Sequence, residues 1–282
     1  MNDNKSKSVA ESIFSTRSEF RDIYPLKEMS VNLIQKLISL FFPHHTTIRF
    51  TQIAEVDVFL DEISANLIQI LISLGEESRE KRNAITKNFI DFLPNIYQTL
   101  LLDAEFIFQG DPAAKHLDDV ILTYPGFGAI TMYRLAHSLC MLGVPTVPRV
   151  ITEYAHQQTG IDIHPGAKIG KPFFIDHGTG TVIGETCEIG NFVKLYQGVT
   201  LGALSVEKKL STTKRHPTIQ DRVIIYSGAT ILGGETVIGH DSVIGGNVWL
   251  TSSINPFMVV YHKSDIQIRN IKEKENVIDF SI

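Results

Sequence analysis

Residues 183–202 read IGETCEIGNFVKLYQGVTLG, and an aliphatic residue returns at every sixth position of this stretch. The same period occurs on both sides of it, with the in-phase residues Ile163, Ile169, Ile175, Ile183, Ile189, Leu195, Leu201, Ile219, Ile225, Ile231, Ile238, Ile244 and Leu250. A sustained period of this length predicts a β-solenoid in which three hexads close one triangular coil of about eighteen residues. Such solenoids wind as left-handed parallel β-helices, against the usual right-handed crossover. An ordinary sandwich of alternating strands would not keep this period.

Besides a one-residue slip between Ile231 and Ile238, two longer interruptions break the period. A slip of two residues surrounds Asp176-His177-Gly178-Thr179-Gly180, and a longer gap separates Leu201 from Ile219. A packed coil needs no extra residues, so an insertion bulges outward and can build a site. The longer gap predicts an outward loop near residues 203–216.

The first half of the chain has a helical period instead. Its apolar stripes predict helices, which fall near residues 33–41, 59–74, 81–104, 112–122, 126–142 and 148–158. The sequence therefore predicts an N-terminal all-helical domain (1–160, its first twenty or so residues loose). A left-handed β-helix (161–254) and a C-terminal tail (255–282) follow.

The composition restricts the class of partners. The chain has 282 residues, 43% of them hydrophobic, and a formal net charge of −5. This mild acidity gives no general attraction to nucleic acid or anionic lipid, and no apolar run approaches the length of a membrane span. The two cysteines, Cys140 and Cys187, lack metal-binding spacing. We expect a cytoplasmic protein without nucleic-acid or membrane partners and without a metal site.

Four short segments stand out in the repeats, and two more lie upstream. They are Asp162-Ile163-His164-Pro165, residues 176–180, residues 198–202, Arg215-His216-Pro217, Gly110-Asp111-Pro112-Ala113 and residues 124–130. In this combination the sequence resembles the serine acetyltransferases, hexapeptide-repeat enzymes that make O-acetylserine from acetyl-CoA and L-serine. The resemblance covers roughly residues 110–250. It implies acetyl transfer to the serine hydroxyl, the first step of cysteine biosynthesis.

The chemistry of this reaction requires a base, because a serine hydroxyl is a weak nucleophile at neutral pH. Histidine suits that role. The resemblance makes His177 the general base and Asp162 the carboxylate that orients its ring. It places Asp111 and Asp176 at the ammonium of serine, and Arg215 with His216 at the carboxylate.

The resemblance also implies how the other participants bind. Acetyl-CoA is expected as a co-substrate, held near Thr200, Gly202 and Ala203, and no permanently bound cofactor is expected. Many family members carry Gly-x-Pro-Ala-Arg after the last coil, which residues 255–261 of this chain lack. The expected assembly is a homotrimer or a dimer of trimers. The terminal Ile282 is expected to dock O-acetylserine sulfhydrylase.

Three other functions fit the same fold. A γ-type carbonic anhydrase would bind zinc through three histidines, and the repeats contain His164, His177, His216 and His240. A sugar O-acetyltransferase is the second alternative, although a clamp of acidic residues and arginine suits an amino acid better than a neutral sugar. The third is a non-catalytic scaffold that docks a partner through its C-terminus.

Overall fold

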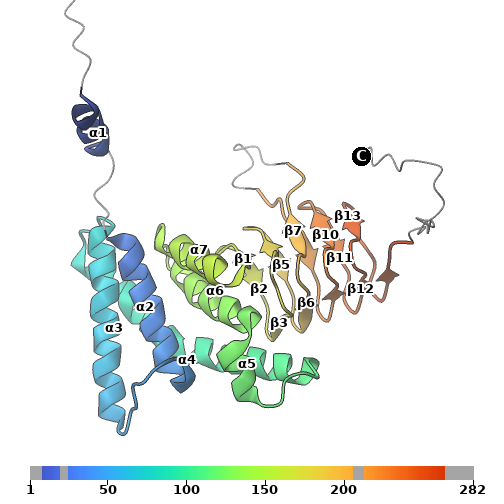
Figure 1. The fold of residues 1–282 in the computed structure, drawn as a ribbon, viewed down its shortest axis with the longest axis horizontal. Coiled ribbons are helices and arrows are strands. Elements are labelled where there is room, and N and C mark those ends of the chain that lie inside the picture. Colours follow the sequence, from blue (N-terminus) through green and yellow to red (C-terminus); the bar gives the residue numbers. More distant parts are fainter. Residues whose placement is uncertain (1–7, 20–24, 206–212, 264–282) are drawn as a thin grey trace, which may run out of the picture.

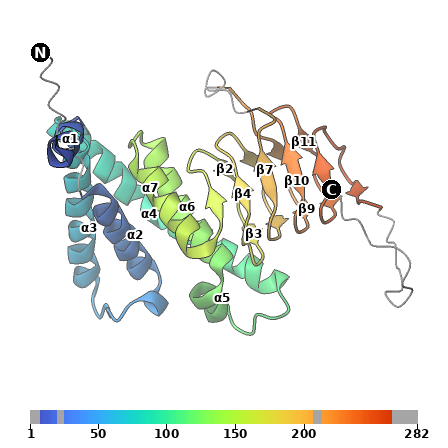
Figure 2. The same ribbon diagram turned by 45° about the horizontal axis from the view of Figure 1, so that its top comes forward.

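In the computed structural model of the chain, a helical part precedes a parallel β-solenoid of about 5 turns (Figure 1). This confirms the predicted fold class. The structure describes residues 8–19, 25–205 and 213–263. The described helices are α1 (Val9–Arg17), α2 (Leu26–Phe41), α3 (Ile53–Ser73), α4 (Arg79–Gly110), α5 (Leu117–Thr123), α6 (Pro125–Met141) and α7 (Val147–Thr159), with a 3-10 helix at Pro43–His45. Both views place the helices at one end of the solenoid (Figures 1 and 2).

The predicted apolar stripes form the core of the helical part. Leu33 and Leu37 of α2 and Ile63 and Leu67 of α3 are fully buried, and these two helices pack against each other. Burying each such side chain stabilises the fold by about 1.5–3 kcal/mol. Helices α4, α6 and α7 then contact the first coil of the solenoid.

Two details of the helical part differ from expectation. Residues 9–17 form helix α1, where the sequence suggested a loose segment, because Ser8 and Glu11 make a capping box. No residue of α1 is buried. The helix expected at residues 112–122 begins later, at Leu117, after the N-cap His116.

Fourteen short strands follow in the described residues: β1 (Asp162–Ile163), β2 (Lys168–Ile169), β3 (Phe173–Ile175), β4 (Val182–Ile183), β5 (Glu188–Ile189), β6 (Val193–Leu195), β7 (Thr200–Gly202), β8 (Thr218–Ile219), β9 (Ile224–Ile225), β10 (Thr230–Leu232), β11 (Val237–Ile238), β12 (Val243–Ile244), β13 (Trp249–Leu250) and β14 (Val259–Val260). They form three parallel sheets. Sheet A contains β1, β4, β7, β10 and β13; sheet B contains β2, β5, β8 and β11; sheet C contains β3, β6, β9, β12 and β14. The chain passes from A to B to C in each coil, so the solenoid is a three-sided prism.

The register stacks the aliphatic residues inside this prism. Ile183 pairs with both Ile163 and Leu201, and Ile231 pairs with Leu201 and Leu250. The turns between sheets form the three edges of the prism. The C–A edge contains residues 176–181 and 196–199. The A–B edge contains residues 164–167, 184–187 and 203–217, and within the last turn residues 206–212 lie outside the described ranges.

The solenoid continues past residue 254, where the sequence predicted its end. Ile254 forms a bridge with Ile238, and β14 pairs with β12. Ile254 and Val260 are again six positions apart, but they are out of phase with Leu250. Because of this change of phase, a constant six-residue period does not predict the last coil.

A buried ion pair joins the helical part to the first coil. Asp103 of α4, which is fully buried, accepts hydrogen bonds from Arg134 Nε and Nη2 of α6 at 2.5 and 2.8 Å. The same carboxylate accepts the backbone N–H of Phe173 at 2.8 Å. Arg134 Nη2 also donates to the Gly170 carbonyl at 3.0 Å. Because every partner belongs to a different segment, the pair fixes α4 and α6 against the solenoid.

Candidate active site

The Asp176–Gly180 segment is a bulge on the C–A edge. Gly180 and Gly198 occupy equivalent places, two residues before β4 and β7. Gly180 donates its N–H to the carbonyl of Gly160, which lies two residues before β1, and Gly198 donates to the carbonyl of Thr179. Residues 176–179 therefore stand where the next coil has only residues 196–197, which accounts for the slip of two residues. His177 and Gly178 have positive φ angles of 54° and 88°. A Cβ on Gly178 would lie 2.4 Å from Ile161 Cδ1, so this turn accommodates only glycine there.

The bulge exposes one side chain and buries its neighbour. The His177 side chain is 73% exposed, whereas Asp176 is buried. The His177 Nε2 atom lies 3.9 Å from Asp176 Oδ1. The other oxygen, Oδ2, lies 3.3 Å from the ammonium of Lys194 on β6. The imidazole is therefore accessible to a substrate and is next to a carboxylate.

Asp111, which follows the last residue of α4, belongs to the same cluster, because its carboxyl group interacts electrostatically with Lys194 and His177. Its Oδ2 accepts a hydrogen bond from the Tyr124 hydroxyl at 2.6 Å, and its Oδ1 accepts the N–H of Ala113 at 2.8 Å. The tyrosine hydrogen bond is the main reason why the pKa of Asp111 lies below its usual value, and the Ala113 N–H adds to it. The same bond to Asp111 raises the pKa of Tyr124 to about 12. Asp111 is thus an anion in this cluster and Tyr124 a neutral donor.

Arg215 and His216 lie on a different edge, A–B, at the end of the inserted loop. The Arg215 guanidinium pairs with Glu185 in the turn of the preceding coil. His216 Nδ1 accepts the Thr186 N–H at 3.1 Å and lies 2.9 Å from the Thr186 hydroxyl. Burial is the main cause that lowers the pKa of His216 to about 4, and Arg215 contributes. His216 is therefore a neutral ring whose Nε2 carries the hydrogen.

Asp162 and Thr200 lie on the outer face of sheet A, between these two edges. Both are half-buried members of strands whose next residue points inward. Asp162 Oδ1 lies 3.2 Å from Arg149 Nη1, and among the described residues no hydrogen bond joins Asp162 to His177. Gly202 ends β7, and Ala203 follows it at the start of the A–B turn.

The fold thus divides the predicted site residues of one chain among three places. Asp176 and His177 lie on the C–A edge, with Asp111 close to them at the end of α4. Arg215 and His216 lie on the A–B edge, and Asp162 and Thr200 lie on the outer face of sheet A. Tyr124, Lys194 and Glu185 join these groups although the sequence assigned them no role. Tyr124 stood in a segment that carried the resemblance, but Lys194 and Glu185 gave no signal as single charged residues in the repeats.

The four histidines of the solenoid do not gather within one chain. His164 and His216 lie on the A–B edge, His177 on the C–A edge and His240 between sheets B and C. In the described ranges, the group with ligand atoms close enough to hold a metal is Glu153, His156 and Asp162. Arg149 already pairs with both carboxylates of this group.

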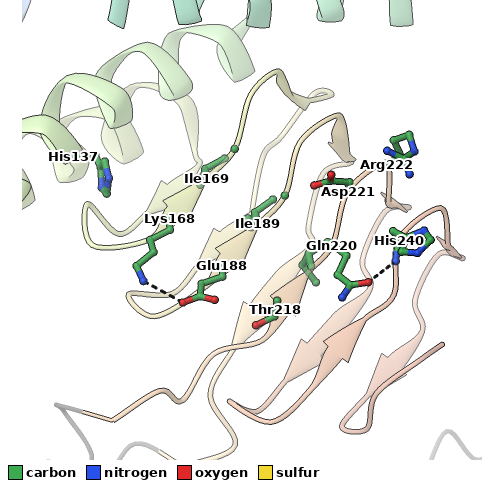
Figure 3. Close-up of a pocket in the computed structure, with 13 residues that line it drawn as sticks. His137, Lys168, Ile169, Glu188, Ile189, Thr218, Gln220, Asp221, Arg222 and His240 are labelled. Carbon is green, nitrogen blue, oxygen red and sulfur yellow. Dashed lines mark hydrogen bonds and ion pairs between the residues drawn. The ribbon is translucent and has the colours of Figure 1, made fainter. Parts of the chain in front are cut away.

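A groove of about 750 Å³ lies over the outer face of sheet B (Figure 3). Lys168 and Glu188 pair along it at 3.2 Å, and the Gln220 amide oxygen accepts the N–H of His240 at 2.9 Å. None of the predicted site residues lines this groove. Size alone therefore does not locate the candidate site.

Two expectations concern other parts of the chain. The docking residue Ile282 lies outside the described residues. In the parts that the structure describes, no helix is both long enough and apolar enough to cross a membrane.

The solenoid and its helical part define the class of hexapeptide-repeat transferases with a left-handed β-helix. Serine acetyltransferase 1 of Entamoeba histolytica, solved in complex with L-cysteine, has a TM-score of 0.74 and 36% identity, covering 81% of this chain and 86% of that one. Isoform 3 from the same organism, in complex with cysteine, has a TM-score of 0.74 and 33% identity, covering 91% and 92%. The chain belongs to the serine acetyltransferase family, as the sequence predicted.

Curated proteins with similar sequences are also serine acetyltransferases. The plasmid serine acetyltransferase of Synechococcus elongatus is 52% identical over 175 residues, which are 60% of this chain and 54% of the relative. The serine acetyltransferase of Bacillus subtilis is 50% identical over 129 residues, 46% of this chain and 58% of the relative. The chain thus spans somewhat more than half the length of these relatives. A search with protein-family models found no match.

Proposed function

We propose that the protein transfers the acetyl group of acetyl-CoA to the hydroxyl of L-serine, giving O-acetyl-L-serine and CoA. One observation carries the proposal: the exposed His177 imidazole lies 3.9 Å from the Asp176 carboxylate and interacts electrostatically with a second carboxylate, Asp111. The histidine supplies a base at neutral pH, and the carboxylates supply counter-charges for an amino acid's ammonium. In the serine acetyltransferase family, this reaction is the first step of cysteine biosynthesis.

The residues suggest a simple course for the reaction. One ring nitrogen of His177 takes the proton of the serine hydroxyl as its oxygen attacks the thioester carbonyl carbon. The tetrahedral intermediate then expels the CoA sulfur, which takes the proton from the imidazolium. A backbone N–H in the turn of Gly202 and Ala203, next to Thr200, can stabilise the negative oxygen of the intermediate.

The positions of the charged residues favour a site shared by two copies of the chain. The ammonium partners are Asp176 on the C–A edge and Asp111 at the end of α4 close to it. Arg215 and His216 lie on the A–B edge, and sheet A separates the two edges. Prisms packed side by side in a ring bring one copy's C–A edge to the next copy's A–B edge. We therefore propose a trimer or a dimer of trimers. The same packing allows Asp162 to exchange Arg149 for the imidazole of another copy.

Three further assignments rest on the family resemblance. Acetyl-CoA is a co-substrate that enters from the cytoplasm and leaves as CoA, so the protein needs no permanently bound cofactor. Ile282 at the C-terminus is the docking residue for O-acetylserine sulfhydrylase. Cysteine, which has the ammonium and carboxylate of serine, competes with serine, in line with the cysteine-bound relatives.

Release of free CoA from acetyl-CoA tests the proposal most directly. We expect release with L-serine that exceeds release with L-homoserine or a sugar, because the clamp fits one amino acid. Release with a sugar but not with serine would instead identify a sugar acetyltransferase. Hydration of CO₂ together with about one bound zinc per subunit would identify a carbonic anhydrase.

A further inference from the structure

Lys194 is a largely buried cation on the outer face of sheet C. It lies in β6 between Val193 and Leu195, in register with Phe174 below and Ile224 above. Its side chain is only 13% exposed. The ammonium lies 4.1 Å from the centre of the Phe174 ring and 4.7 Å from that of Tyr196. Both distances allow a cation–π interaction.

The ammonium also connects three elements around the candidate serine site. It lies 3.3 Å from Asp176 Oδ2 in the bulge and donates to the Gly110 carbonyl at 3.1 Å. Gly110 ends α4, where the helix dipole favours a positive charge. Asp111 follows directly, and Lys194 helps to lower the pKa of this carboxyl group.

The charged residues of this cluster determine its net charge. Asp111 and Asp176 are carboxylates, Lys194 is a cation, and Tyr124 donates to Asp111 as a neutral phenol. His177 is counted here as the uncharged base that accepts the proton of the substrate. The cluster therefore has one unbalanced negative charge, which the positive charge of one ammonium group would balance. Without Lys194 it would have two.

Packing alone does not explain a lysine at this position. Its neighbours in the column of outward residues, Phe174 and Ile224, are apolar, so a side chain that only filled space would be apolar too. A cation in so little solvent is favourable only with partners that compensate for desolvation. Here those partners are the groups that would receive the substrate.

We propose that Lys194 is a specificity-determining residue of the ammonium subsite. It neutralises one of the two carboxylates, so the subsite accepts an amino acid with one ammonium group and disfavours a diamino acid. The inference deepens the proposed function and rests on it, because it takes Asp111 and Asp176 as the receptors of the substrate's ammonium.

Two matched ligands test the charge count. L-Homoserine and L-2,4-diaminobutanoate have the same length and differ in a hydroxyl against a second ammonium. We expect calorimetry on the full-length protein to show homoserine binding at least about tenfold more tightly than diaminobutanoate. Lys194→Met should shift this preference by about tenfold toward diaminobutanoate, since it leaves a second carboxylate unbalanced at close range. Lys194→Arg should keep the wild-type preference.

Lys36→Met is the matched control. Lys36 also pairs with a carboxylate, Glu62 at 2.9 Å, and lies near an aromatic ring, Phe59, but it joins α2 to α3 away from the solenoid. This variant should leave the preference unchanged.

Two outcomes would overturn the inference. One is equal binding of the two ligands by the wild-type protein, and this measurement does not depend on whether any variant folds. The other is an unchanged preference in a folded Lys194→Met protein. Serine-dependent CoA release is measured separately on the wild-type protein. Turnover of serine without the ligand preference removes only the inference, whereas the ligand preference without turnover removes only the proposed reaction.

Discussion

At the scale of single residues, the backbone of the bulge decides what His177 can do. Two consecutive positive φ angles, at His177 and Gly178, lead the chain outward for two residues and back into register at Gly180. A histidine at a positive φ angle is less stable than a glycine would be there. The surrounding turn therefore has to hold His177 in a conformation that its own backbone disfavours. The consequence is a ring that solvent and substrate can reach, above a buried carboxylate.

The first prediction follows from this exposure. His177→Ala should lower kcat by about two to four orders of magnitude, the usual effect of removing an acid–base group. The side chain is largely exposed, so the melting temperature should not fall. Steady-state kinetics with a thermal melt measures both. Near-wild-type turnover in the folded variant would remove His177 from the mechanism.

The second prediction concerns Arg215 on the A–B edge. Arg215→Ala should raise the KM for serine strongly and leave the affinity for acetyl-CoA nearly unchanged, because it removes a partner of serine's carboxylate alone. Titration of each substrate at saturation of the other separates the two effects. Equal losses for both substrates would mean that Arg215 maintains the loop.

The third prediction is a loss of stability in acid. The folded-state pKa of His216, about 4, lies below the unfolded value because the ring is buried. Between about pH 4 and pH 6.5 the unfolded chain therefore binds more protons. Stability from this residue is fully present above pH 6.5 and decreases as the pH falls toward 4. Burial lowers the pKa of His164 as well, so both residues act in the same direction.

Urea unfolding between pH 7.5 and 5 measures this dependence. The free energy of unfolding should decrease as the pH falls, and His216→Asn should make the decrease shallower. An identical slope in the variant would show that His216 does not contribute. Lys168→Met, which removes an exposed ion pair with Glu188 on sheet B, is a suitable comparison.

At the scale of elements, the six-residue period was sufficient to predict the solenoid because each inward residue repeats the same environment. It failed at the last coil, where a changed phase before Ile254 broke the pattern without breaking the pairing. The motifs led us to assign Asp111, Asp176 and His177 to one site, and their shared role in that site stays a prediction. They did not indicate Lys194, because only the folded chain brings β6 to the end of α4. Nor could sequence order show that the residues assigned to the site lie on different edges.

The fourth prediction concerns the ion pair that joins these elements. Asp103→Ala should lower the free energy of unfolding by about 3–5 kcal/mol, because it leaves the Arg134 guanidinium and the Phe173 N–H without their partner. Asp91→Ala on the same helix is the control, since Asp91 pairs with Lys87 at the surface. Its change should stay within about 0.5 kcal/mol. Equal effects of the two variants would show that the buried pair does not fix the helices to the solenoid.

At the scale of the whole molecule, the proposed site requires assembly, because the charged residues assigned to it lie on separate edges of one chain. If serine bridges the C–A edge of one copy and the A–B edge of the next, a monomer has every residue of the site but no complete site. Mass measurement in solution should then give a trimer or a multiple of three. An active monomer would exclude the shared site.

Mixed oligomers supply the stricter test of the same idea, which is our fifth prediction. His177→Ala and Arg215→Ala chains are each impaired at serine concentrations far below KM. When they are unfolded together and refolded in equal amounts, about a quarter of the shared sites should receive His177 from one chain and Arg215 from its neighbour. Activity should therefore exceed the sum of the separately refolded variants. If both residues served a site within one chain, mixing would restore nothing, because every chain would carry one defect.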